Sequence, residues 1–235
     1  MSYQAVFKRY ELKYLLTWEQ KMRLLQGMEE HMALDRYGRT TIRNLYFDTD
    51  TYRLIRHSLE KPAYKEKLRL RSYTQTESPV YVELKKKYRG VVYKRRLSMS
   101  EQAAMEWLCG SEDRGQDSQI GREIDYFRHY YEPLRPTIFL SYEREAYYCR
   151  QGGDFRVTFD DNILARQEAL SLTAPVWGTT LLEPGNVLME LKTSGGIPLW
   201  MTELLTRERL YKTTFSKYGN AYLSLIDYKG VYHYA

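Results

Sequence analysis

The sequence has little cysteine, little histidine and no long apolar segment. Only two cysteines, Cys109 and Cys149, occur among 235 residues, with no CxxC spacing and no histidine at ligand spacing. Neither a disulfide framework nor a zinc site is therefore indicated, and a reducing cytoplasm is expected. The four histidines are scattered, so none is expected to be catalytic. No run approaches the roughly 18 apolar residues of a membrane span, which predicts a chain without a membrane segment.

Charge and aromatic content favour a β-rich protein with an anionic partner. The chain has 36 Lys and Arg against 30 Asp and Glu, a net charge of +6. This excess favours an anionic ligand but is too small to indicate nucleic acid. The 23 tyrosines are typical of half-buried strands. The length fits one domain over residues 1–235.

Hydrophobic periodicity predicts an α+β fold with about eight strands, enough to close an antiparallel barrel. The strands are expected near residues 5–15, 41–47, 64–73, 79–87, 91–98, 137–148, 155–160 and 186–193. Helices are expected at 17–32, from Ser98 to Gly110, at 120–131 and from about Pro198, all packed outside the barrel. Surface loops are expected at 110–119 and 171–185.

The first of these helices has both a start signal and an apolar stripe. Thr17 and Gln20 form a capping-box pair. Its core face is expected to carry Trp18, Met22, Leu25, Met28 and Met32.

Charged side chains recur at every second position of seven predicted strands. Because successive strand side chains point to opposite faces, Lys67, Arg69 and Arg71 share one face while Leu68 and Leu70 share the other. The same pattern includes Glu11 with Lys13, Glu83 with Lys85 and Lys87, Lys94 with Arg96, Tyr142 with Arg144, Arg156 with Thr158 and Asp160, and Glu190 with Lys192.

Two interpretations of this pattern are open. A single strand of this kind is typical of a sheet whose charged face lies in water. The predicted helices, however, need apolar strand faces to cover them, which would turn the charged faces inward. A lumen crowded with cations requires a polyanion or interspersed carboxylates. The carboxylates Glu11, Glu83, Asp160 and Glu190 could hold Mg²⁺ or Mn²⁺ beside phosphate oxygens, or could form salt bridges.

Eight short motifs, in order along the chain, resemble the polyphosphate polymerase domain of the VTC (vacuolar transporter chaperone) family, within the CYTH-like triphosphate tunnel metalloenzymes. They are Arg9-Tyr-Glu-Leu-Lys13-Tyr14, Lys67-Leu-Arg69-Leu-Arg71, Val82-Glu83-Leu-Lys85-Lys-Lys87, Lys94-Arg-Arg96, Tyr142-Glu-Arg144, Arg156-Val-Thr158-Phe-Asp160, Glu190-Leu-Lys192 and Phe215-Ser216-Lys217-Tyr218. The resemblance implies an eight-stranded tunnel barrel.

The resemblance also implies roles for individual residues. The residues expected to grip phosphates during catalysis are Lys13, Arg69, Arg71, Lys85, Lys94, Arg144, Arg156 and Lys217. Further substrate contacts are expected from Glu11, Lys67, Lys87, Arg96, Tyr142, Lys192 and Ser216. Glu190 is the expected ligand of Mn²⁺ or Mg²⁺.

These resemblances favour ATP-dependent polyphosphate synthesis as the function. Arg9 stands where the triphosphatase branch has the first Glu of its Glu-x-Glu-x-Lys motif, which favours the more cationic polymerase branch. Because members of that branch can carry membrane helices, a membrane-protein partner for export is also expected. A triphosphate or tripolyphosphate hydrolase and a non-catalytic polyphosphate-binding module remain alternatives.

Overall fold

A single antiparallel sheet of eleven strands dominates the part of the chain that the computed structural model describes, residues 10–73, 79–110 and 118–227. The strands are β1 (Tyr10–Thr17), β2 (Met32–Leu34), β3 (Thr40–Asp48), β4 (Tyr64–Ser72), β5 (Val80–Tyr88), β6 (Val91–Met99), β7 (Arg135–Cys149), β8 (Arg156–Arg166), β9 (Thr179–Thr180), β10 (Asn186–Thr193) and β11 (Lys212–Thr213). Their order is β11-β1-β10-β8-β7-β3-β4-β5-β6, with β2 on β7 and β9 on β8. Each of the eight predicted strands is present.

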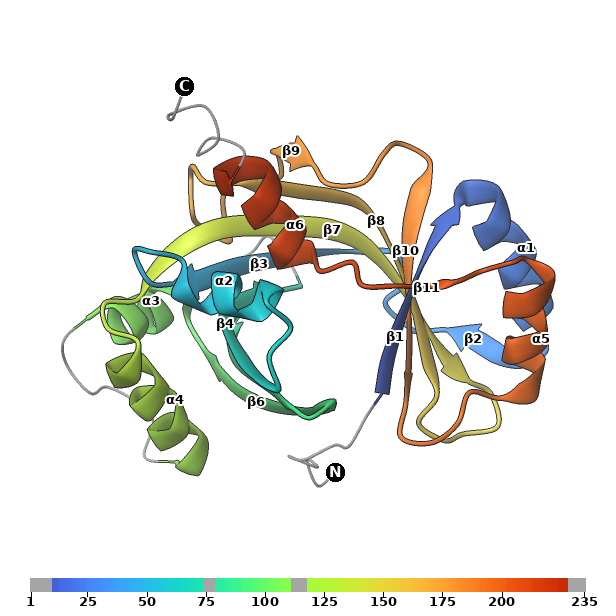
Figure 1. Cartoon of the computed structure of the whole chain (residues 1–235), viewed down its shortest axis with the longest axis horizontal. Helices are drawn as coiled ribbons and strands as arrows, with labels where there is room; N and C mark the ends of the chain where they lie inside the picture. Colours follow the sequence, from blue (N-terminus) through green and yellow to red (C-terminus); the bar gives the residue numbers. More distant parts are fainter. Residues whose placement is uncertain (1–9, 74–78, 111–117, 228–235) are drawn as a thin grey trace.

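The prediction of a closed eight-stranded barrel is wrong in strand number and in closure. The sheet has eleven strands, and its edge strand β6 does not pair with β1. The free edge of β1 is instead used by β11, which pairs with Lys13 and Tyr14. Figure 1 shows the result, a curled sheet in which β6 and β1 lie on opposite sides of the centre.

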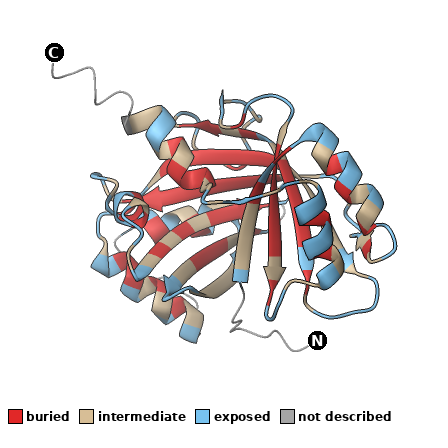
Figure 2. Cartoon of the chain, turned by 45° about the vertical axis from the view of Figure 1, so that its right-hand side comes forward, coloured by how far each residue is buried: buried red, intermediate tan, exposed pale blue. Residues whose placement is uncertain are grey.

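The helices are α1 (Trp18–Met28), α2 (Arg53–Leu59), α3 (Glu101–Cys109), α4 (Gln119–Tyr130), α5 (Leu199–Arg207), α6 (Lys217–Tyr222) and the π-helical turn η1 (Leu223–Asp227). The four predicted helices, α1, α3, α4 and α5, cover the outside of the sheet. Helix α6 instead packs against the inner face, where Tyr218 contacts Tyr46. Trp107 of α3 and Phe127 of α4 pack in one apolar cluster with Leu68 and Leu70 of β4. The apolar strand face is therefore the outer one, as the alternation predicts. Figure 2 shows the strands largely buried and the outer helix surfaces exposed.

The helix predictions are correct in existence but not in every detail. Thr17 caps α1 in a capping box with Gln20, as predicted. Trp18 and Met22, however, are 47% and 50% exposed. Met28 is buried in α1 as predicted, but the other buried residues of this helix are Lys21 and Leu24, and Met32 lies beyond the helix in β2. Lys21 can be buried because it forms a 2.7 Å ion pair with Glu145.

Three other segments differ from expectation. The helix predicted to begin at Ser98 is α3, and it is capped by Ser100, whereas Ser98 lies in β6. The seven-residue α2 was not predicted. The proposed loop at 110–119 and the first residues of the 5–15 strand fall largely outside the described residues.

Within the described residues, no helix has the length and apolar character needed to cross a membrane.

Candidate functional site

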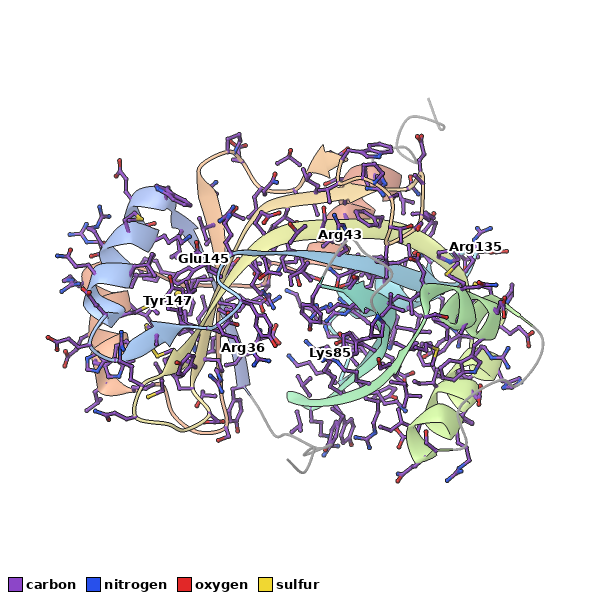
Figure 3. All side chains as sticks on the ribbon, turned by 180° about the vertical axis from the view of Figure 1, so that it is seen from behind. Arg36, Arg43, Lys85, Arg135, Glu145 and Tyr147 are labelled. Carbon is purple, nitrogen blue, oxygen red and sulfur yellow. The ribbon has the colours of Figure 1, made fainter. Side chains whose placement is uncertain are left out.

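The inner face of the curled sheet lines a cavity of about 300 Å³. Thirteen of the sixteen predicted site residues line it: Glu11, Lys13, Lys67, Arg69, Arg71, Lys85, Lys94, Tyr142, Arg144, Glu190, Lys192, Ser216 and Lys217. They come from β1, β4, β5, β6, β7, β10 and α6. The alternation pattern thus brings residues from distant parts of the chain to one place, and Figure 3 shows Lys85 in the hollow enclosed by the sheet.

The other three predicted residues lie elsewhere. Lys87 is exposed near the end of β5, and Arg156 is exposed at the start of β8, 5.6 Å over the Tyr148 ring. Arg96 is half-buried, and its guanidinium is held by Glu83 rather than presented to the cavity. All three side chains point to the predicted face of their strands. Lys87 and Arg156, however, lie where their strands leave the enclosed part of the sheet.

Glu83 is the centre of one cationic cluster. Its carboxylate is 1% exposed and lies 2.8 Å from Arg69, 2.6 Å from Lys94, 2.5 Å from Arg96 and 3.8 Å from Arg71. Burial opposes ionisation, but these cations hold the pKa of Glu83 well below its usual range. Glu83 is therefore an anion that fixes the direction of the cations around it.

A second cluster is centred on Asp160 and Glu190. Asp160 is fully buried and accepts two 2.6 Å hydrogen bonds from Arg144 and one of 2.5 Å from Lys217. The carboxylate of Glu190 lies near four cations: Lys192 at 3.0 Å, Lys217 at 3.2 Å, Lys13 at 3.4 Å and Arg144 at 3.5 Å. Burial opposes ionisation of both carboxyls, but the neighbouring cations lower both pKa values. Both groups are ionised and partly neutralise this half of the cavity.

Lys67 differs from these cations because no carboxylate among the described residues pairs with it. Its ammonium donates a 3.1 Å hydrogen bond to Ser216 Oγ and lies 5.8 Å from the Tyr218 ring centre. Burial, with Lys85 and Lys13 adding repulsion, lowers the pKa of Lys67 to about 7. Overall, nine cationic side chains line the cavity, whereas four carboxylates face them, Glu11 and Glu190 in the lining and Glu83 and Asp160 behind it. With Lys67 and Lys94 protonated, the lining therefore has a formal excess of five positive charges over the carboxylates that face it.

Helix α6 brings Ser216 and Lys217 to the lumen, and a hydrogen-bond network fixes its position. Tyr218 stacks on Tyr46 of β3 with ring centres 4.3 Å apart, and its hydroxyl donates a 2.9 Å hydrogen bond to Asp48. Asp48 is fully buried and also accepts from the backbone N–H groups of Leu54 and Ile55 in α2. The position of Lys217 is thus tied to β3 and α2.

The carboxylates do not form a ready site for a resident metal ion. Among residues 10–73, 79–110 and 118–227, no three Asp, Glu, His or Cys side chains gather to hold one. Glu190, the predicted ligand, already forms ion pairs with four cations, which would repel a divalent ion. The site as placed does not fit a protein-held Mn²⁺ or Mg²⁺.

Several lining residues were not predicted as site residues. Tyr10, Tyr46, Val92 and Tyr218 contribute to the lining, and Asp160 lies directly behind it. Tyr46 was missed because β3 shows no charge alternation. Its neighbour on the same face, Asn44, was an available signal, because a buried amide in a strand requires polar partners, and Asn44 accepts from Arg71.

A sequence comparison places the chain in a family. The VTC domain matches residues 8–226. The chain belongs to the VTC domain family. No curated protein sequence matches it.

Solved structures share the fold of this VTC domain at low identity. A proposed adenylate cyclase from Bacillus halodurans has 16% identity and a TM-score of 0.56, covering 91% of this chain and 96% of that chain. A proposed adenylyl cyclase from Hippeastrum, described as having dominant triphosphatase activity, has 15% identity and a TM-score of 0.57, covering 94% and 97%. A proposed adenylate cyclase from Vibrio parahaemolyticus has 10% identity and a TM-score of 0.52, covering 92% and 98%.

Proposed function

We propose that this VTC domain binds a phosphate chain in its lumen and transfers phosphoryl groups there, with ATP-dependent polyphosphate synthesis as its activity. The observation that carries this proposal is the excess of cations in the lumen, above all Lys67, which no described carboxylate neutralises. A polyanion supplies the missing negative charge. Phosphoryl transfer asks the protein mainly for positioning and charge stabilisation, which fixed Lys and Arg provide.

The residues divide this work by their position. Arg69 and Arg71 are oriented by Glu83, Tyr46, Asn44 and Tyr142, so their remaining N–H groups are directed before the substrate arrives. Lys217 and Lys13 converge on Glu190, where they can neutralise charge on the transferred group.

The proposed reaction requires no protein nucleophile. A terminal oxygen of the bound phosphate chain attacks the γ-phosphorus of ATP, a new P–O–P link forms, and the bond to ADP breaks. The acceptor and the leaving group are both phosphates, so the same cations can hold each of them.

A hydrolase is the second candidate, and the description of the Hippeastrum structure favours it. Water would then take the place of the acceptor phosphate. A module that binds polyphosphate without catalysis is the third candidate. We do not expect nucleic acid to be a ligand of the lumen. A membrane-protein partner for export stays a proposal.

Product analysis separates these functions. The pure protein is incubated with ATP and Mn²⁺ or Mg²⁺, which phosphate oxygens bind, and products are sized on a gel. ADP with growing phosphate chains supports the polymerase, whereas orthophosphate from ATP or tripolyphosphate supports the hydrolase. Binding without turnover under all these conditions would overturn the enzymatic proposal. The variant Lys67→Met should lose the activity, and Arg36→Gln, at an exposed arginine outside the lumen, should keep it.

A further inference from the structure

A second cavity, of about 630 Å³, lies between α2, the start of β4, the end of β5 and α4. None of its lining residues lines the lumen. Both helices lie in the left half of Figure 1. Its volume is within the range of small-molecule sites, and neither the phosphate-binding motifs nor the proposed reaction uses it.

Two arginines with no carboxylate partner lie on one side of this groove. Arg53 and Arg56 are three residues apart in α2 and therefore share its exposed face. No ion pair of the described residues involves either one. The Arg53 guanidinium lies 5.4 Å from the Tyr130 ring centre and 5.3 Å from that of Tyr131. Stacking of this kind orients a guanidinium without using its N–H donors, so they remain available to an anion.

Exposed aromatic rings form the opposite side. Tyr126 and Tyr130 are four residues apart in α4, are 71% and 56% exposed, and stack with ring centres 6.4 Å apart. Single exposed rings are common, but two aligned rings beside an arginine that has no carboxylate partner are not required by packing. Ring faces of this kind are surfaces on which nucleic-acid bases stack.

The buried carboxylate of the groove, that of Glu66, already has hydrogen-bond and ion-pair partners. Glu66 is 8% exposed, accepts a 2.9 Å hydrogen bond from the Tyr131 hydroxyl and lies 3.6 Å from Lys86. The other lining carboxylate, Glu60, lies 3.5 Å from His57. The buried carboxylate Glu66 is therefore engaged within the groove, whereas Arg53 and Arg56 have no carboxylate partner among the described residues.

We propose that this groove binds a nucleotide, with its phosphate on Arg53 and Arg56 and its base against the tyrosines of α4. A bare phosphate chain would use the arginines but not the rings, and a nucleoside would use the rings but not the arginines. The proposal is independent of the reaction in the lumen, because the two cavities share no lining residue.

Calorimetric titration with AMP, adenosine and inorganic phosphate tests it on the whole chain. AMP suits the purpose because its single phosphate engages few lumen cations. The wild type should bind AMP more tightly than it binds either adenosine or phosphate. Arg53→Gln and Tyr130→Ser should each weaken AMP binding at least about tenfold, the scale of a charged hydrogen bond or a stacked base.

Two control variants make the outcome decisive. Arg36 is also an exposed arginine over a tyrosine ring, 4.7 Å from Tyr37, but it lines neither cavity, so Arg36→Gln should leave AMP binding unchanged. Lys67→Met changes only the lumen and should also leave it unchanged. AMP binding that is lost in Lys67→Met but kept in Arg53→Gln would overturn the groove site, as would equal affinities for AMP and phosphate. Failure of lumen function alone would appear as loss of tripolyphosphate binding, with the AMP results intact.

Discussion

Lys85 Nζ of β5 lies 3.1 Å from Glu11 Oε2 of β1, so an ion pair spans the gap where the sheet does not close. The lysine holds the pKa of Glu11 well below its usual range, an effect that exceeds the opposing effect of burial. The two sides of the lumen are therefore linked here by side chains rather than by a strand ladder.

Glu11→Gln should change stability and binding in opposite directions. Loss of the partly exposed pair should lower the free energy of unfolding by up to about 1 kcal/mol. It also releases Lys85 from a competing carboxylate, so the affinity for tripolyphosphate should rise. Urea unfolding and calorimetry measure the two effects, with Glu19→Gln, at an exposed glutamate of α1, as the matched control. Weaker tripolyphosphate binding in Glu11→Gln would contradict this role.

Glu190→Gln should remove turnover while phosphate binding is retained. The carboxylate holds Lys13 and Lys217 together, and without it their geometry at the transferred phosphate is lost. The expected result is a lower kcat with little change in KM. Because a buried ionic cluster is broken, the free energy of unfolding should also fall by roughly 3 kcal/mol. Unchanged kcat would refute the assignment, and Asp161→Asn, outside the lumen, is the control.

Leu70→Ala and Arg71→Met should separate the two faces of β4. Leu70 is fully buried in the outer apolar cluster, whereas Arg71 lines the lumen. Leu70→Ala should lower the free energy of unfolding by about 2–5 kcal/mol with tripolyphosphate affinity nearly unchanged. Arg71→Met should weaken tripolyphosphate binding at least about tenfold. The reverse pattern in melting and titration experiments would mean that the faces are exchanged.

The lowered pKa of Lys67 predicts that the protein becomes more stable above neutral pH. Its pKa in the folded state is about 7, against an ordinary value of 10.5, because of burial and neighbouring lysines. Between these values the unfolded chain binds the proton more strongly, so the free energy of unfolding should increase as pH rises from about 7 towards 10. Urea unfolding at several pH values measures this slope. Lys67→Met should make it smaller, and an identical slope in that variant would exclude Lys67 as the titrating group.

Affinity should depend on the number of phosphates and on salt. Cations from seven elements converge on one cavity, so each added phosphate meets another oriented charge. We expect affinity to increase from orthophosphate through pyrophosphate and tripolyphosphate to longer chains and to fall steeply with salt, as it does for nucleic-acid phosphates. Calorimetry of the four ligands at two salt concentrations tests this. Equal affinity for orthophosphate and tripolyphosphate would be incompatible with a convergent site.

Much of the fold and lumen could be predicted because strand parity is a local property. The alternation Lys67, Arg69, Arg71 is visible over five residues, and the side chains line the cavity as expected. Parity says nothing, however, about where a strand leaves the enclosed region, so Lys87 and Arg156 could not be separated from the rest. The open sheet could not be predicted either, because the edge of β1 is occupied by β11, a strand of only two residues, Lys212–Thr213, with no pattern of its own.

The core face of α1 could not be predicted for a different reason. Apolar residues such as Trp18 and Met22 suggested one face, but burial of Lys21 depends on Glu145, which is 124 positions away. An ion pair across such a separation leaves no local signal. The central role of Asp160 likewise becomes visible only when Arg144 and Lys217 are seen around it.

The pairing of β1 with β10 and β11 has a consequence for how this protein is made. β1 leaves the ribosome before its strand partners, which begin at Asn186 and Lys212. Until those segments emerge, β1 has two unpaired edges, and the lumen lacks both Glu190 and Lys217. Pairing of β3 with β7 can occur earlier in synthesis, whereas the cationic pocket can be completed only after β10 and α6 have emerged. A nascent chain therefore cannot capture polyanions in this pocket before β10 and α6 are in place.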